Sequence, residues 1–301
     1  MLSIDRAFKS ERLLKALTGL SIKEFANLLY SFSPLFDQWS SSRRESRKRA
    51  EGAGRKWDLE GPSQKLFFLL FYVKVYPTFD VAGFFFDVDR SRTNRWVHAW
   101  MPLLEKALGE KVKLPERKIQ SVEEFLKQFP EVKEILIDGT ERPIQRPKNQ
   151  EKQKENYSGK KKRHTRKNLI ITDKKKRILV VSPTVKGSQH DYQMLKDWDI
   201  MNQLPNTLVT LVDLGFQGIR TDFPEHQKIL IPQKKPKKRE LNEIQKAQNT
   251  ALSSLRVVVE HAIGGIKRLK SLTDTYRNRK EHFDDQLMMI GCGIWNYHLA
   301  Q

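Results

Sequence analysis

The sequence predicts an α-helical N-terminal region followed by a mixed α/β domain. Two observations lead to this prediction. Helical apolar periodicity dominates up to about residue 108, and short β-branched runs separated by polar turns begin near residue 134. Strands interspersed with helical segments are typical of an α/β domain. With 301 residues, 38% of them apolar, the chain is long enough to bury a core of this size.

Composition and motif positions divide the chain into four expected parts. They are an N-terminal helical region with a basic arm (1–56), a helix-turn-helix domain (57–112), a connector (113–133) and the α/β domain (134–301).

The charge balance identifies the class of partner. Lys and Arg number 56 against 36 Asp and Glu, a formal charge of +20, which attracts polyanions and makes double-stranded DNA the expected partner. The single cysteine, Cys292, excludes a disulfide framework and a cysteine-based zinc finger, and it fits a reducing compartment. The most apolar run, residues 66–73, is too short to span a bilayer, so we expect a soluble, cytoplasmic protein with no membrane partner.

The first expected helix occupies residues 21–40. Ser21 and Glu24 stand at capping-box spacing before a run with helical periodicity. Residues 42–57 then carry many basic side chains and two glycines, without apolar periodicity. This stretch predicts either a mobile basic arm or a plain solvated linker.

Residues 80–108 predict a helix, a short turn and a longer helix. Ser91 is the expected N-cap of the longer helix. Arg92 and Arg95 lie away from its apolar face, as a recognition helix for the DNA major groove requires. Ordinary packing of two helices remains the alternative. The apolar face comprises Val97, Trp100, Met101 and Leu104.

Two of the expected strands end in an aspartate followed shortly by glycine. Asp138 follows "EILI" and Asp213 follows "TLVTLV". Ligand groups collect at strand ends in open α/β sheets, so the two carboxylates can share a cation, although a lone aspartate there is often only a turn residue. The expected strands are 134–138, 168–172, 177–182, 207–213 and 228–232, and the expected helices are 191–197, 239–270 and 281–299.

The stretch 253–272 places a glutamate in an apolar helical run. At 100° per residue Ser253, Arg256, Glu260 and Lys267 form one narrow polar stripe. Glu260 then lies at the edge of the core and can reach the strand-end aspartates, or it can simply pair with Arg256 one turn away. The expected apolar sector that docks on the sheet consists of Leu252, Leu255, Val259, Ile263 and Ile266.

Two basic runs are expected to contact DNA phosphates. Residues 146–167 hold ten Lys and Arg against two Glu, a local charge of +8, with Lys160, Lys161, Lys162 and Arg163 in succession. Residues 234–239 form the second run, and either run can instead be a solvated hairpin.

Three further polar residues have less specific expected roles. Asp191 begins a helix, where it caps the N-terminus or serves as a fourth acidic ligand. His164 and His190 are expected to be structural rather than metal ligands.

Taken together, these residues resemble the DDE transposases of insertion sequences. The order Asp138, Asp213, Glu260 and the spacing R-x3-E-x6-K from Arg256 to Lys267 match that family's acidic triad and last-helix signature. Ser253 stands where the full signature has tyrosine, which favours the Harbinger-related, insertion-sequence family five type. The segments "ENYSGKKKRHT", "GSQHDYQML" and "DLGFQG" are similar to the same type.

The resemblance implies an RNase H-like catalytic domain and a DNA transposase. Asp138, Asp213 and Glu260 would hold two divalent ions, Mg²⁺ or Mn²⁺, and Arg256 and Lys267 would contact phosphates. Such an enzyme binds terminal inverted repeats, cleaves at the element ends and joins the 3′-hydroxyls to target DNA. The resemblance also implies a homodimer or higher multimer that brings two ends together, and association with the bacterial nucleoid.

Two other functions remain open. The chain can be a catalytically silent, transposase-derived protein that binds DNA sequence-specifically, or a general RNase H-like nuclease, which would not need a helix-turn-helix.

Overall fold

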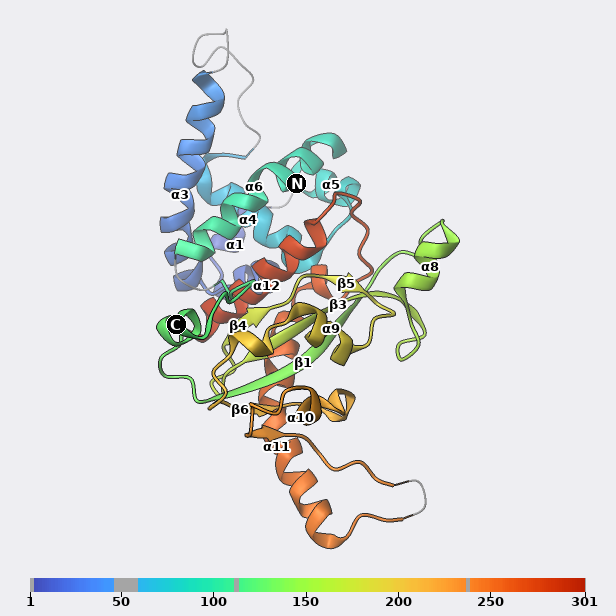
Figure 1. Cartoon of the computed structure of the whole chain (residues 1–301). Coiled ribbons are helices and arrows are strands. Elements are labelled where there is room, and N and C mark those ends of the chain that lie inside the picture. Colours follow the sequence, from blue (N-terminus) through green and yellow to red (C-terminus); the bar gives the residue numbers. More distant parts are fainter. Residues whose placement is uncertain (1–2, 46–58, 111–113, 237–238, 301) are drawn as a thin grey trace. The chain divides into compact units, whose positions relative to one another are not determined.

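A computed structural model describes residues 3–45, 59–110, 114–236 and 239–300 (Figure 1). Most of the expected basic arm therefore lies outside the described residues. The chain forms two compact units. The helical unit comprises Met1–Leu114, Ile266–Asp274 and Gln286–Gln301, and the sheet unit comprises Pro115–Gly265 and Thr275–Asp285.

The helical unit is built around the apolar run that the sequence marks at 66–73, which is buried throughout. The capping box is confirmed, because Ser21 Oγ accepts from the Glu24 amide at 3.2 Å and Glu24 Oε2 accepts from the Ser21 amide at 2.6 Å. Among the described residues, no helix has the length and apolar content needed to cross a membrane. The helices are α1 (Ile4–Phe8), α2 (Glu11–Thr18), α3 (Ile22–Glu45), α4 (Gly61–Val75), α5 (Phe79–Phe86), α6 (Arg90–Glu110) and most of α12 (Phe283–Leu299).

Helices α5 and α6 form the expected helix-turn-helix. The turn closes tightly on Gly83, whose carbonyl accepts from the Val88 amide at 2.9 Å. A Cβ at Gly83 would lie only 2.5 Å from the Val88 carbonyl oxygen, so the turn requires glycine. The apolar face of α6 is confirmed, since Val97, Trp100, Met101 and Leu104 are all buried.

The expected N-cap of α6 is wrong. The helix starts at Arg90, and Asp89 Oδ1 accepts from the Arg92 amide at 2.9 Å, as an N-cap side chain does. Ser91 lies inside the first turn, and its hydroxyl donates to the same carboxylate. Both residue types favour caps, so the pattern alone did not fix which one begins the helix.

The sheet unit has a curled mixed sheet of RNase H-like character. The five expected strands are present, and two short ones, β2 and β5, are additional. The path of hydrogen-bonded neighbours is β2-β3-β1-β6-β7, with β4 and β5 also paired to β3. The strands are β1 (Glu134–Pro143), β2 (Tyr157–Ser158), β3 (Arg163–Thr172), β4 (Ile178–Val181), β5 (Val185–Lys186), β6 (Val209–Leu211) and β7 (Ile229–Leu230).

Helices cover both faces of this sheet, with α9 in front and α11 passing behind in Figure 1. Ile135 and Ile137 of β1 share a buried cluster with Met194 and Leu195 of α9. Because side chains alternate along a strand, Asp138 points to the opposite face, toward α11. The helices of this unit are α7 (Val122–Gln128), α8 (Gln150–Asn156), α9 (Asp191–Trp198), α10 (Ile219–Asp222) and α11 (Glu243–Ile266).

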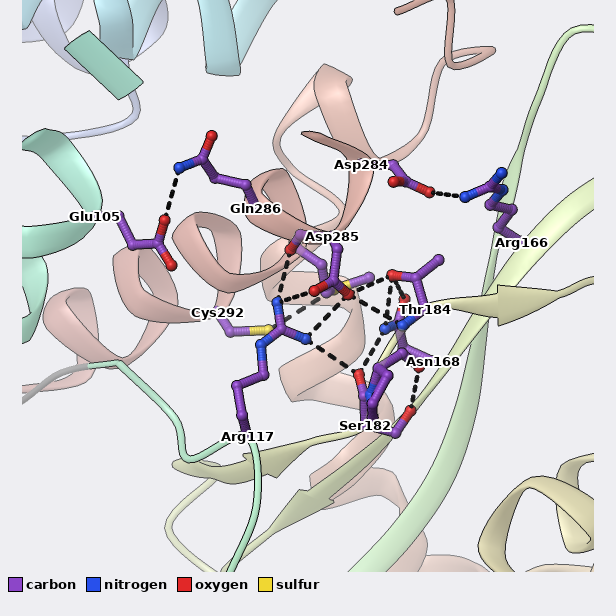
Figure 2. Close-up of polar contacts among 12 residues, drawn as sticks. Glu105, Arg117, Arg166, Asn168, Ser182, Thr184, Asp284, Asp285, Gln286 and Cys292 are labelled. Carbon is purple, nitrogen blue, oxygen red and sulfur yellow. Dashed lines mark hydrogen bonds and ion pairs between the residues drawn. The ribbon is translucent and has the colours of Figure 1, made fainter. Parts of the chain in front are cut away.

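A polar network fixes the start of α12 to the sheet (Figure 2). Asp285 binds Arg117 at 2.7 Å and accepts from the Thr184 hydroxyl at 2.7 Å. The neighbouring carboxylate, Asp284, binds Arg166 of β3 at 2.8 Å. Arg142 of β1 donates to the Asp284 carbonyl at 2.6 Å. The first turn of α12 therefore belongs structurally to the sheet unit.

Candidate active site

The fold brings two of the expected catalytic carboxylates to neighbouring parallel strands. Strands β1 and β6 are parallel, with Leu136 opposite Leu211, and Asp138 and Asp213 each lie two residues farther along. The expected end of the first strand at 138 is wrong, because β1 continues to Pro143 and Asp138 lies inside it, whereas Asp213 follows β6. One oxygen of each aspartate accepts from a backbone amide one or two residues farther along the chain. Asp138 Oδ1 accepts from Gly139 at 2.8 Å, and Asp213 Oδ1 accepts from Gly215 at 2.7 Å. Each Oδ2 is thereby oriented by the backbone.

The electrostatics at Asp138 are those of a site that attracts a cation. Burial raises the pKa of Asp138 above its ordinary value, and the charges of Asp213 and Asp191 raise it further. Arg256 and the Gly139 amide act in the opposite direction. Carboxylates that repel one another in a partly dehydrated site are hard oxygen ligands suited to a divalent ion. Asp138 and Asp213 thus fit the metal that the resemblance implies.

Arg256 of α11 lies against Asp138. Its Nη2 is 3.6 Å from Asp138 Oδ2, with 19% and 18% of the two side chains exposed. The Arg256 Nε is buried and has no hydrogen-bond partner in the part of the chain that the structure describes. Arg256 therefore partly neutralises the aspartate.

Glu260 is one helical turn farther along α11 and is exposed. Among the described residues, no three His, Cys, Asp or Glu side chains gather closely enough to hold a metal ion. The structure thus unites the two aspartates, while Glu260 stays outside such a group.

Two expectations about the helix of Glu260 are wrong. It ends at Ile266 rather than 270, so Lys267 is the first residue beyond it and belongs to the helical unit. Leu255, expected in the docking sector, is 44% exposed, whereas Val259, Ile263 and Ile266 are buried. The apolar pattern continues through the following 3-10 turn, which is why periodicity alone extended the helix.

Sequence reasoning missed a buried lysine beside the site. Lys167 of β3 is paired across the ladder with Glu141, and its Nζ lies 3.5 Å from Glu141 Oε1 and 3.0 Å from Asp191 Oδ1. Asp191 in turn lies over Gly139, where a Cβ would come within 2.9 Å of its Oδ2. Because Lys167 belongs to the basic run 146–167, the pattern placed it on DNA. Facing acids in antiparallel strands were the signal for its true position.

The cap of α9 also differs from expectation. His190 is the N-cap residue, and its Nδ1 accepts from the Tyr192 amide at 3.3 Å. Asp191 is the first residue of the helix, and its carboxylate binds Lys167 instead of capping.

The remaining basic candidates lie on accessible surface. Residues 160–163 are exposed in the β2–β3 hairpin, where Arg163 begins β3. Arg95 of α6 is exposed, and Arg92 is half-buried beside Asp89, with its Nε 3.7 Å from Oδ2. His164 is half-buried, its ring against Tyr157.

Comparison with known proteins identifies the family of the chain. Residues 137–296 match the family described as DDE superfamily endonuclease, and residues 57–110 match the helix-turn-helix of DDE superfamily endonuclease. A probable transposase for insertion sequence element IS702, from Microchaete diplosiphon, is 31% identical over 256 residues, covering 85% of this chain and 86% of the relative. No solved structure matches the chain.

The endonuclease match takes in the strand of Asp138, the turn of Asp213 and the helix of Glu260, and the second match takes in α4 to α6. The chain therefore belongs to the DDE superfamily of endonucleases, among its insertion-sequence transposases.

Proposed function

We propose that this protein binds the terminal inverted repeats of its element, cleaves phosphodiester bonds at the element ends and joins the exposed 3′-hydroxyls to target DNA. The observation that supports this most directly is the placement of Asp138 within β1 and of Asp213 just after the neighbouring parallel strand β6, beside the helix that carries Glu260. The proposal includes a multimer that holds two ends together and association with the nucleoid.

Asp138, Asp213 and Glu260 would hold two divalent ions, Mg²⁺ or Mn²⁺. Such a pair, when bound, activates the attacking hydroxyl and stabilises the leaving oxygen. The backbone amides of Gly139 and Gly215 keep the two aspartates in place. Arg256 would contact the scissile phosphate, and Glu260 would have to turn inward from its exposed position to join the two aspartates.

The test of the chemistry is cleavage of a duplex that ends in the element's inverted repeat. The full-length protein and Asp213→Asn are incubated with Mg²⁺ or Mn²⁺, and the matched control is Asp199→Asn. Asp199 is exposed in a left-handed conformation that asparagine tolerates, so this control should cleave normally. Equal cleavage by all three proteins would remove the proposed catalytic role of Asp213.

The DNA-binding role of α6 is tested separately. Arg95→Ala should weaken binding to the inverted repeat by about 1–3 kcal/mol and relax sequence preference, as loss of a base contact does. Lys106→Ala removes an exposed charge from the same helix and serves as control. Identical losses for both variants would mean that α6 contributes only general charge.

Two observations favour a second candidate, a catalytically silent DNA-binding protein. Arg256 contacts Asp138, and the described residues contain no group of three potential ligands. A protein of this kind would bind the repeat but leave it uncut at every Mg²⁺ and Mn²⁺ concentration. The same cleavage experiment distinguishes the two.

A further inference from the structure

The sheet unit contains a basic pocket at the far end of β1 from Asp138. Its volume is about 340 Å³, within the range of small-ligand sites, which starts at ~300 Å³. Five cationic side chains from three segments line it together with one aromatic ring. They are Arg146 and Lys148 after β1, Arg166 of β3, and Arg277, Arg279 and Tyr276 before α12.

The three segments are held together by backbone contacts. The Tyr276 amide donates to the Pro143 carbonyl at 2.8 Å, and the Gln145 amide donates to the Tyr276 carbonyl at 3.3 Å. These two bonds attach the segment before α12 to the end of β1, so the pocket is part of the folded sheet unit. Arg166 enters from the strand paired with β1.

The lining of the pocket is strongly cationic. None of the lining residues, all from 144–148, 166 and 276–279, is acidic. Asp284 binds Arg166 at 2.8 Å, and Arg146 donates to the uncharged Gln153 at 2.9 Å. Lys148 and Arg279 are exposed. The pocket therefore has the potential to bind a polyanion with several phosphates.

The lining also offers surfaces for a flat ring. Tyr276 is half-buried in the wall, and Asn278 adds an amide beside it. Unpaired bases stack on aromatic rings and guanidinium planes while cations hold the adjoining phosphates. Paired bases inside a duplex do not present their faces in this way. The combination of cations, an aromatic ring and a nucleotide-sized volume favours an unpaired nucleotide over duplex backbone.

The pocket is separate from the site of Asp138. Residue 144 lies six positions farther along the chain, which corresponds to ~20 Å along an extended strand. That length matches roughly six nucleotides of stacked DNA at 3.4 Å each.

We propose that this pocket, formed by Arg146, Lys148, Arg166, Tyr276, Arg277 and Arg279, binds an unpaired DNA nucleotide and its flanking phosphates. The inference rests on the proposed function, because it assigns the pocket to a DNA strand handled at the active site.

The experiment measures binding without chemistry. Full-length Asp213→Asn protein in EDTA is titrated against a fluorescent duplex with a three-nucleotide overhang and against the same duplex with a blunt end. Lys148→Ala with Arg279→Ala removes two pocket charges. Lys152→Ala with Lys280→Ala removes two exposed charges from adjacent segments that do not line the pocket and is the matched control.

The pocket variant should bind the overhang duplex at least tenfold more weakly than the control variant, with little difference on the blunt duplex. Its salt dependence, log K against log salt, should flatten by about 1.4, which is two single-strand phosphate contacts at ~0.7 each. Equal losses in the pocket and control variants would overturn the proposal. Equal losses on both duplexes would also overturn it, since the pocket would then bind duplex phosphates.

A second measurement needs no substitution. A 5-bromodeoxyuridine placed in the overhang should crosslink under ultraviolet light to the peptide that contains residues 276–279. Crosslinks confined to other peptides would contradict the proposal even if a pocket variant failed to fold. Because both measurements exclude cleavage, a failed proposed function would appear as binding and crosslinking without activity in the wild-type protein.

Discussion

Arg256 on α11 and Asp138 on β1 form a contact across the sheet–helix interface, with Nη2 and Oδ2 3.6 Å apart. A guanidinium in this position competes with any cation for the same carboxylate oxygen. The position of Arg256 therefore affects the net charge at the two aspartates. The same guanidinium can also bind phosphate.

Arg256→Gln should strengthen metal binding while slowing cleavage. Loss of the guanidinium leaves Asp138 less neutralised, so Mn²⁺ should raise the melting temperature at lower concentrations than in the wild type. Single-turnover cleavage should fall by about 10²-fold or more, as when a preorganised charge at a reacting phosphate is removed. Ser253→Ala, one turn away, is the control. Weaker Mn²⁺ stabilisation in Arg256→Gln would contradict the competition.

Lys167→Met should destabilise the sheet unit strongly. Glu141 and Asp191 would lose their shared cation while remaining partly dehydrated, and breaking a buried ion pair costs about 3–5 kcal/mol. Urea unfolding measures the change, with the exposed Lys160→Met as control, expected within about 0.5 kcal/mol of the wild type. Adding Glu141→Gln should recover part of the loss. A loss no larger than that of the control would show that the lysine is not needed for charge balance.

Two glycine-to-alanine substitutions should change the free energy of unfolding in opposite directions. Gly83→Ala places a Cβ 2.5 Å from the Val88 carbonyl oxygen, so the turn between α5 and α6 must open and binding to the inverted repeat should be lost. Gly264→Ala meets nothing within 4 Å inside α11 and should stabilise the protein by up to about 1 kcal/mol. Thermal unfolding and DNA binding of both variants check this, and tight repeat binding by Gly83→Ala would contradict the turn geometry.

Lys65 should make stability depend on pH in the alkaline range. Burial lowers its pKa from 10.5 to about 8. The unfolded chain then holds more protons than the folded one between about pH 8 and 10.5, so the free energy of unfolding should rise with pH across this window and stay lowered below it. Removing the charge with Lys65→Met should abolish this rise.

The size of that effect follows from the location of the ammonium group. Its Nζ donates to the Leu59 carbonyl at 2.9 Å and to the Gly61 carbonyl at 3.0 Å, which offsets part of the dehydration. We expect the free energy of unfolding to rise by about 1–2 kcal/mol, less than the pKa shift alone implies, because these two hydrogen bonds stabilise the charged form. Urea unfolding at pH 7 and pH 10 measures it, with Lys106→Met as the exposed control. If the free energy of unfolding of Lys65→Met rises by the same amount between pH 7 and pH 10, the pH dependence comes from other groups.

The sequence predicted the main strands because their residues face buried surroundings on both sides. Strands β1, β3 and β6 contain runs such as residues 134–138 and 168–172 in which apolar side chains are consecutive. The two-residue strands β2 and β5 exist only through pairing with β3, which no local pattern records.

The two aspartates of the site were predictable for the same reason, since each ends an apolar run. The position of Arg256 on Asp138, the burial of Lys167 and the exposure of Glu260 were not. They depend on how α11 and the β1–β3 ladder meet, which is a property of packing between segments far apart in the sequence. Charge runs report composition and do not distinguish an exposed lysine from a paired, buried one.

The C-terminal segment has a consequence for how the protein is made. Tyr297 donates to the Glu24 carbonyl at 2.9 Å, and His298 lies 2.7 Å from the Glu24 carboxylate, both within the helical unit. Residues from 286 onward thus complete a unit whose first helix begins at Ile4. A ribosome must translate the whole sheet unit before this helical unit can close, so polypeptides released early should be unable to present a finished recognition surface to DNA.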